Sequence, residues 1–164
     1  MSKSQEDLRQ AFAGESQANR KYLAFAKAAE KEGYSQVAKL FRAAAEAETV
    51  HAHNHLSALK GIGQTEQNLK EAIAGETHEF KNMYPAMIKD AEAEGDKTAL
   101  RTMTYANEVE KVHAALYQKA LEKMGNLEKA DYYVCSVCGY TCENEPPDKC
   151  PVCNANAKAF NKIS

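Results

Sequence analysis

Apolar and charged residues, chiefly Ala, Leu, Glu and Lys, are interspersed along four long stretches of the chain that contain few glycines or prolines. The stretches run from about Ser4 to Glu32, Ser35 to Lys60, Asn68 to Glu94 and Asp96 to Met124, and a glycine follows each of them. A glycine just after a helix accepts the left-handed conformation that ends it. The pattern therefore predicts four helices, each about 40 Å long. Pro85, inside the third stretch, is expected to kink or loosen that helix.

The first two stretches resemble the last two. LRQAFAGES, from Leu8, aligns with LKEAIAGET, from Leu69, and AEKEG, ending at Gly33, aligns with AEAEG, ending at Gly95. The offset between the copies is 61 residues at first and 62 later. A duplicated helical hairpin can pack with approximate two-fold symmetry into a four-helix bundle. A site on that axis would receive the same residues twice.

Composition changes near residue 130, where the cysteines, most prolines and several aromatic residues begin. We therefore predict two domains, a helical domain over residues 1–127 and a small loop-rich module over residues 128–164. The fold class is mainly α with a small C-terminal β module. The formal net charge of −2 gives little support to nucleic-acid binding. No apolar run approaches the roughly 18 residues of a membrane span, and the polar N-terminus lacks a signal peptide, so we expect a soluble cytoplasmic protein.

The duplication pairs six residues that can bind metal. The pairs are Glu15 with Glu76, Glu48 with Glu110, and His51 with His113. In each copy the second Glu and the His are three residues apart, so both side chains point from one helix face. Four carboxylates and two imidazoles at one level of a bundle core are costly without cations. The set is the pattern of di-iron carboxylate bundles; surface positions for these residues are the alternative.

One feature breaks the symmetry between the copies. Glu79 shares a helix face with Glu76, whereas Ala18 stands at its place in the first copy. Glu79 is a candidate seventh ligand, which would make the two metals inequivalent, or else a surface carboxylate. Tyr22 and Tyr84 lie near the ligand face. They are candidates to donate hydrogen bonds to ligand carboxylates, or else ordinary core aromatics.

Two Cys-x-x-Cys pairs lie in the C-terminal module. Cys135 and Cys138 are separated by 11 residues from Cys150 and Cys153. This spacing strongly favours a tetrahedral four-thiolate site. A module of about 34 residues is too small for an adequate core, so the metal must hold it together. The site suits zinc as a structural metal or iron as a one-electron centre. Cys142 fits neither pair and is expected to be a free thiol.

Over nearly its full length the sequence resembles the rubrerythrin family. The motifs that carry the resemblance are AGES at Glu15, ETVH ending at His51, AGETHEF up to Phe80, EKVH ending at His113, and the two cysteine pairs. The resemblance implies a ferritin-like di-iron bundle joined to a rubredoxin-like Fe(Cys)4 domain. It also implies a peroxidase that reduces hydrogen peroxide to water and acts as an NADH peroxidase when coupled to a reductase.

The resemblance also implies roles for individual residues. Glu48 and Glu110 would bridge two irons, with Glu15 and His51 on one iron and Glu76 and His113 on the other. Glu79 would replace His51 when the iron it serves moves on oxidation, so Glu79, His51, Tyr22 and Tyr84 are the expected catalytic group. The cofactors would be two non-haem irons per bundle and one iron on Cys135, Cys138, Cys150 and Cys153. A reductase or rubredoxin would supply electrons.

The connector between the second and third stretches predicts how chains assemble. A ferritin-like topology makes these two helices parallel, so the connector must span the bundle. Residues 61–67 reach at most about 25 Å, whereas each helix is about 40 Å long. We therefore expect a domain-swapped homodimer in which each bundle combines hairpins from two chains. A simple up-down-up-down bundle is the alternative.

Three other functions compete with peroxide reduction. One is an iron-binding, ferroxidase or storage protein of ferritin type, against which the cysteine module argues. Another is a peroxide-sensing or zinc-ribbon interaction protein without turnover. An oxidase that uses O2 is the third, because the ligand set alone separates O2 from H2O2 poorly.

Overall fold

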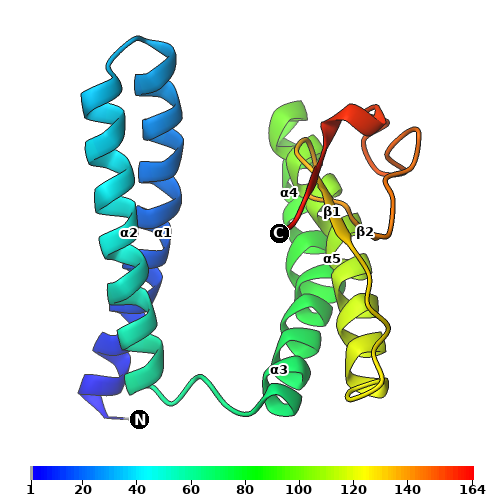
Figure 1. Ribbon diagram of the computed structural model, residues 1–164, viewed down its shortest axis with the longest axis horizontal. Helices are drawn as coiled ribbons and strands as arrows, with labels where there is room; N and C mark the ends of the chain where they lie inside the picture. Colours follow the sequence, from blue (N-terminus) through cyan, green and yellow to red (C-terminus); the bar gives the residue numbers. More distant parts are fainter. Residues whose placement is uncertain (1) are drawn as a thin grey trace. The chain divides into compact units, whose positions relative to one another are not determined.

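The computed structural model describes residues 2–164 and forms two compact units, one ending at Gly63 and the other running from Gln64 to Ser164. The first unit is a helical hairpin of α1 (Lys3–Lys31) and α2 (Ser35–Ala58), drawn in blue and cyan in Figure 1. The second contains the remaining helices and three short strands. The predicted fold class, mainly α with a small C-terminal strand module, is confirmed.

The hairpin of the first unit is held by small residues and a cluster of rings. Buried alanines, among them Ala26, Ala38 and Ala45, line the seam between α1 and α2 and let the two backbones approach closely. The rings of Tyr22, Phe25 and Phe41 pack together, with centroids 5.6–6.3 Å apart. These contacts fix the height of each side chain on α1 against its neighbours on α2.

The helix ends follow the predicted signals, with one difference. Gly33, Gly95 and Gly125 adopt positive φ angles of 88°, 71° and 93°. At the end of α2 the left-handed residue is Lys60, with φ of 56°, and not Gly61. A Cβ atom at Gly61 would meet the side chain of Leu56, which would have to move to make room for it. The expected role of a C-terminal glycine is therefore wrong at this one helix.

The third predicted helix is one continuous rod with an irregular turn in its middle. It consists of α3 (Thr65–His78), the π-helical segment η1 (Glu79–Met83) and α4 (Tyr84–Glu94). The backbone N–H of Tyr84 donates to the carbonyl of Glu79, five residues earlier. Pro85 follows η1 directly, and because it has no N–H, one backbone hydrogen bond of a regular α-helix cannot form there. The loosening expected from Pro85 is present, and it takes the form of a π-helical turn.

The π-helical turn explains why the offset between the two copies changes. Glu15 matches Glu76 at an offset of 61, whereas Tyr22 matches Tyr84 at 62, so the extra residue of the second copy lies between them. A hydrogen bond from i to i+5 encloses one residue more than the α-helical bond. The turn thus absorbs the insertion, and residues beyond it keep the helix face that their counterparts have in the first copy.

The last helix, α5 (Lys97–Glu122), is antiparallel to this rod and carries the C-terminal module at its side. Asp96 caps α5, because its carboxylate accepts hydrogen bonds from the N–H groups of Thr98 and Ala99. The module contains β1 (Tyr132–Cys135), β2 (Thr141–Glu143), the 3-10 turn η2 (Ala157–Ala159) and β3 (Phe160–Lys162). The strands form an antiparallel sheet in the order β2-β1-β3.

Strand β2 and the turn before it pack against α5 (Figure 1). Lys119 on α5 forms an ion pair of 2.6 Å with Glu143 at the end of β2. Gly139, in the turn before β2, approaches Val109 of α5 so closely that a Cβ atom would lie in van der Waals contact with it. Among residues 2–164, no helix is both long and apolar enough to cross a membrane.

Candidate metal centres

The first unit brings three of the predicted ligands together. Glu15 comes from α1, and Glu48 and His51 come from one face of α2. One donor atom from each lies within 4.8 Å of the other two. The Nδ1 atom of His51 lies 2.8 Å from Oε2 of Glu48. Oxygen and imidazole donors that converge in this way suit a divalent metal ion.

The second unit repeats the arrangement with the matching residues. Glu76 comes from α3, and Glu110 and His113 come from α5, and their donor atoms again lie within 4.8 Å of one another. Nδ1 of His113 is 2.8 Å from Oε2 of Glu110 and 3.9 Å from Oε1 of Glu76. Each hairpin therefore builds one Glu-Glu-His group from its own residues.

The second group is electrostatically unfavourable without a cation. The pKa of Glu76 is raised to about 7, chiefly by burial and then by the nearby Glu110 carboxylate, against the opposing attraction of His113. A carboxyl that is reluctant to ionise beside another carboxylate is stabilised as the anion by a bound cation. The donor set of carboxylate oxygens and imidazole nitrogens thus fits a metal in chemistry as well as in spacing.

Of the three residues expected beside the ligands, Tyr84 and Glu79 lie near the carboxylates of the second unit, whereas Tyr22 lies in the aromatic cluster of the first. Burial raises the pKa of Tyr84, and so do the carboxylates of Glu110, Glu79 and Glu76, which places the phenol among these acids. Glu79 is near enough to raise the pKa of Glu76 as well, but it is not part of the group whose donor atoms converge. Tyr22 packs in the aromatic cluster of the first unit.

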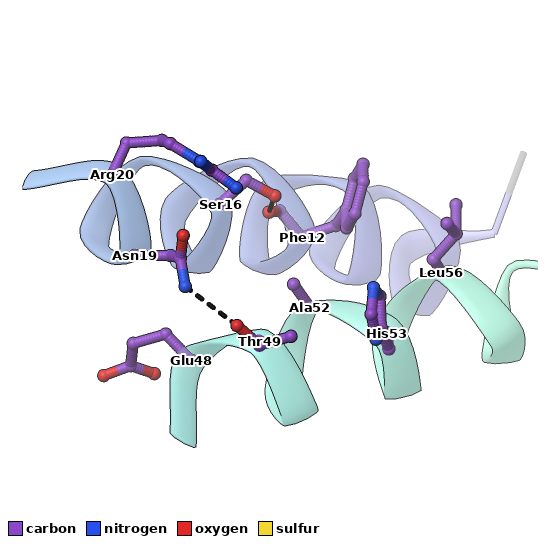
Figure 2. Close-up of a pocket in the computed structure, with 9 residues that line it drawn as sticks. All are labelled: Phe12, Ser16, Asn19, Arg20, Glu48, Thr49, Ala52, His53 and Leu56. Atoms are coloured by element: carbon purple, nitrogen blue, oxygen red, sulfur yellow. Dashed lines mark hydrogen bonds between the residues drawn. The ribbon is translucent and has the colours of Figure 1, made fainter. Parts of the chain in front are cut away.

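A pocket of about 250 Å³ adjoins Glu48 in the first unit (Figure 2). Asn19 lies in its wall and is 8% exposed. Its amide nitrogen donates to the Ala45 carbonyl at 2.7 Å and to the Thr49 hydroxyl at 2.8 Å. This bond ties α1 to α2 beside Glu48, and sequence reasoning missed it because Asn19 has no asparagine counterpart in the second copy.

The four predicted cysteine ligands converge in the C-terminal module. Sγ of Cys135 lies 3.6 Å from that of Cys153, and Sγ of Cys138 lies 3.5 Å from that of Cys150. All four donor atoms are within 4.8 Å of one another, and none is in a disulfide. A metal with bonds of about 2.3 Å to four sulfurs separates them by roughly 3.8 Å. The spacing therefore fits a tetrahedral four-thiolate centre.

Burial raises the pKa of the Cys138 thiol, and neighbouring thiols raise it further. A bound metal ion reverses this tendency, because it binds and stabilises thiolates. Cys142 lies outside the cluster, and its thiol donates to the Glu145 carbonyl at 3.6 Å.

One contact joins the module to the second Glu-Glu-His group. Nε2 of His113 lies 3.0 Å from the hydroxyl of Thr141 on β2. No sequence signal predicts this contact, because Thr141 stands outside every metal motif and reaches His113 only through the packing of β2 on α5.

Comparison with known proteins gives a consistent result for both parts of the chain. Residues 6–121 match the family described as Rubrerythrin, and residues 133–161 match the one described as Rubrerythrin, rubredoxin-like domain. Rubrerythrin-2 of Clostridium acetobutylicum is 37% identical over 170 residues, which cover 93% of this chain and 92% of that protein. Nigerythrin of Nitratidesulfovibrio vulgaris is 36% identical, covering 90% of this chain and 80% of its own.

Solved structures agree with these matches. A structure of nigerythrin in a fully reduced, all-ferrous state is 33% identical, with a TM-score of 0.58. The match covers 99% of this chain and 88% of that chain. A mixed-valence state of nigerythrin matches equally well.

Proposed function

The chain belongs to the rubrerythrin family, and on that premise we propose that it is a peroxidase that reduces hydrogen peroxide to water. The family assigns the coarser function, a di-iron oxidoreductase with a rubredoxin-like domain and a role in oxidative stress. Its cofactors are iron, at a carboxylate–histidine di-iron site and at the four-cysteine cluster.

The observation that carries the proposal is the pairing of two Glu-Glu-His groups with a four-thiol cluster in one chain. A storage protein needs the carboxylate ligands but has no use for the cluster. A structural zinc module needs the cluster but not the matched carboxylates. A reductase of peroxide uses both, because reducing H2O2 to two water molecules takes two protons and two electrons, and the electrons must be replaced after each turnover.

The ligand residues would hold the iron, and bound iron would supply the two electrons needed to break the O–O bond of peroxide. Glu15, Glu48 and His51 would hold one ion and Glu76, Glu110 and His113 the other, with Glu48 and Glu110 as the carboxylates available to both. The carboxylates of this set neutralise the charge of the cations and keep the pair stable inside a protein.

Glu79 and Tyr84 are proposed to act beside the ligands. Glu79 is a further carboxylate close to Glu76. It would replace His51 as a metal ligand when the charge at the site increases on oxidation. Tyr84 carries a phenol among three carboxylates, where it can donate a hydrogen bond to one of them. Tyr22, in the aromatic cluster, supports the hairpin by packing and has the weaker claim to a catalytic role.

Electrons are proposed to enter through the Fe(Cys)4 centre from a reductase or a rubredoxin. Clustered cysteines that serve as thiolate ligands are typical of a reducing compartment, which supports a cytoplasmic location. Hydrogen peroxide is the oxidant in this proposal. An activity assay distinguishes peroxide reduction from iron storage and from sensing without turnover.

The short connector supports a domain-swapped homodimer. Helix α2 ends at Ala58 and α3 begins at Thr65, so residues 59–64 alone join the two hairpins. They span at most about 22 Å. Each hairpin also leaves large apolar side chains exposed, such as Leu40 and Val50 in the first unit and Met87 in the second. We propose that the complementary hairpin of a second copy covers these side chains.

The direct test is anaerobic turnover. The iron-loaded protein is supplied with H2O2, NADH and a reductase of broad specificity, and NADH consumption is measured. The proposal expects one NADH oxidised for each H2O2 consumed, without O2 release, since two electrons reduce one peroxide. A variant with Cys138→Ser and Cys153→Ser is expected to lose NADH-dependent turnover. Iron uptake without NADH oxidation would favour storage, and a colourless zinc-bound cluster would favour a sensor or interaction module.

A further inference from the structure

The hydroxyl of Thr141 occupies an unusual position between the two metal-binding parts of the second unit. It belongs to β2 of the cysteine module, yet its Oγ1 atom lies 3.0 Å from Nε2 of His113 on α5. On the far side of the imidazole, Nδ1 lies 2.8 Å from the Glu110 carboxylate. Both ring nitrogens of His113 therefore have a partner, and the two partners come from different domains of the protein.

The hydrogen bonds of Thr141 decide which nitrogen of His113 carries a proton. Thr141 has one hydroxyl proton, and it donates this proton to the carbonyl of Gly139 at 3.1 Å. Its oxygen is then available to accept from an N–H at Nε2 of His113. A neutral ring that donates from Nε2 leaves its Nδ1 lone pair for a cation held among the carboxylates of Glu110 and Glu76, whose oxygens lie 2.8 and 3.9 Å from Nδ1. This tautomer is the one that binds a metal ion through Nδ1.

The matching histidine of the first unit has no such support. Nδ1 of His51 faces Glu48 in the same way, but within residues 2–164 no side chain or carbonyl meets its Nε2. The side chain of His51 is 53% exposed, against 28% for His113. Within the described residues, His113 therefore has a hydrogen-bond partner at Nε2 and His51 has none.

The same bonds connect the module to the helix. Gly139 directly follows Cys138, so Cys138, the Gly139 carbonyl, Thr141 and His113 form an unbroken covalent and hydrogen-bonded chain. The Lys119–Glu143 ion pair lies on the same side of α5 and holds the other end of β2. A loss of the hydroxyl would leave β2 docked by this ion pair while removing the bond to the imidazole.

We propose that Thr141 is a positioning residue that fixes the orientation and tautomer of His113, so that Nδ1 faces the carboxylate ligands. It holds the imidazole from the cysteine module. A use of this bond in peroxide reduction rests on the proposed function, whereas the hydrogen bond itself does not.

Three variants of the full-length chain test the role of Thr141. Thr141→Val keeps the shape of the side chain and removes the hydroxyl, and Thr141→Ser restores the hydroxyl. Lys119→Met is the matched control, because it removes the neighbouring ion pair of β2 and leaves Thr141 in place. Both sites are loaded with zinc, which is diamagnetic and suits either donor set. Long-range ¹H–¹⁵N NMR then identifies the protonated ring nitrogen of His113 and its rate of exchange with water.

The expected result is a slowly exchanging proton on Nε2 of His113 in the wild-type protein and in Lys119→Met. In Thr141→Val this proton should exchange about three- to tenfold faster, in line with the net strength of one hydrogen bond. Thr141→Ser should restore the slow rate. A proton on Nδ1 in the wild type, or equal rates in wild type and Thr141→Val, would overturn the inference. Absence of peroxide turnover in the iron protein would refute the proposed function and leave this result unaffected.

Discussion

The ionisation of Glu76 links the stability of the folded protein to pH. In the protein without carboxylate-bound metal its pKa is raised to about 7, first by burial and then by Glu110. The folded state therefore holds a proton on Glu76 that the unfolded chain, with a pKa near 4.5, releases. The stability that comes from this proton is fully present below about pH 4.5 and is lost as the pH rises through about 7.

This linkage predicts a pH-dependent difference between two proteins. With zinc confined to the cysteine module, the wild type should lose stability relative to Glu76→Gln as the pH rises from about 5 to about 8. Glutamine cannot ionise, so that variant lacks the trend. Urea denaturation at several pH values measures it. A constant difference between the two proteins across this range would show that Glu76 ionises normally.

Glu79 is the residue on which the two copies differ most in chemistry, since Ala18 replaces it in the first copy. Glu79→Ala should slow the oxidation of the reduced protein by peroxide by about ten- to a hundredfold, as is usual for groups beside a metal site. Two irons should still bind, because Glu79 is outside the convergent group. Stopped-flow absorbance measures the rate.

Glu71→Ala provides the control for this experiment, since Glu71 is exposed on the same helix. It should leave the rate unchanged. Oxidation of Glu79→Ala at the wild-type rate would remove Glu79 from the mechanism.

At the residue scale, the duplication was the sequence feature that singled out the candidate ligands. Glu48 and His51 stand out because Glu110 and His113 repeat them, and in the structure each pair lies with a second carboxylate, that of Glu15 or Glu76. Thr141 could not be found in this way. Its contact depends on how β2 packs against α5, and no local spacing encodes that packing.

At the scale of elements, the π-helical turn is the main departure from regular structure. The sequence holds one trace of it, the change of offset from 61 to 62 between Glu76 and Tyr84. Pro85 marks the same region, but a proline predicts only some irregularity and not its kind. The four helical stretches themselves were predictable because each is long and has a glycine close to its end, although at α2 the left-handed residue is Lys60.

The π-helical turn makes a deletion experiment informative. Removing Lys81, an exposed residue inside the turn, should convert it to regular α-helix and keep every later residue on its present face. Stability should change by less than about 1 kcal/mol. Circular dichroism and thermal unfolding measure the outcome.

Lys89 is the matched control, because it is exposed but lies in the regular helix α4. Its removal rotates the following residues by about 100° and should turn Ala91 away from its buried position, at a cost of about 1–3 kcal/mol. Equal losses for both deletions would mean that the turn does not absorb the extra residue.

At the scale of the whole molecule, the proposed exchange of hairpins can be tested by complementation. One chain carries Glu48→Ala and His51→Ala, and the other carries Glu110→Ala and His113→Ala. Neither chain alone can form a complete ligand set. In a swapped heterodimer, the intact first hairpin of one chain meets the intact second hairpin of the other, so one bundle regains all six ligands.

Co-expression of the two chains with different tags should therefore restore iron binding and peroxide turnover in the doubly purified species. Each chain purified alone should be inactive. If the mixed species is also inactive while it remains folded and dimeric, each bundle is built from one chain and the exchange is wrong. The connector length was the sequence feature that led to this prediction, and it stays a prediction.

The central claim is that the matched carboxylate and histidine groups hold iron that reduces peroxide. One titration tests it: the fully reduced protein, with its iron counted, is mixed anaerobically with increasing H2O2 while visible absorption is recorded. We expect about three irons per chain, two for the di-iron ligands and one for the four thiolates. One H2O2 should oxidise each di-iron pair, and further peroxide should then oxidise the thiolate-bound iron. Iron that stays reduced in the presence of excess H2O2 would contradict the account.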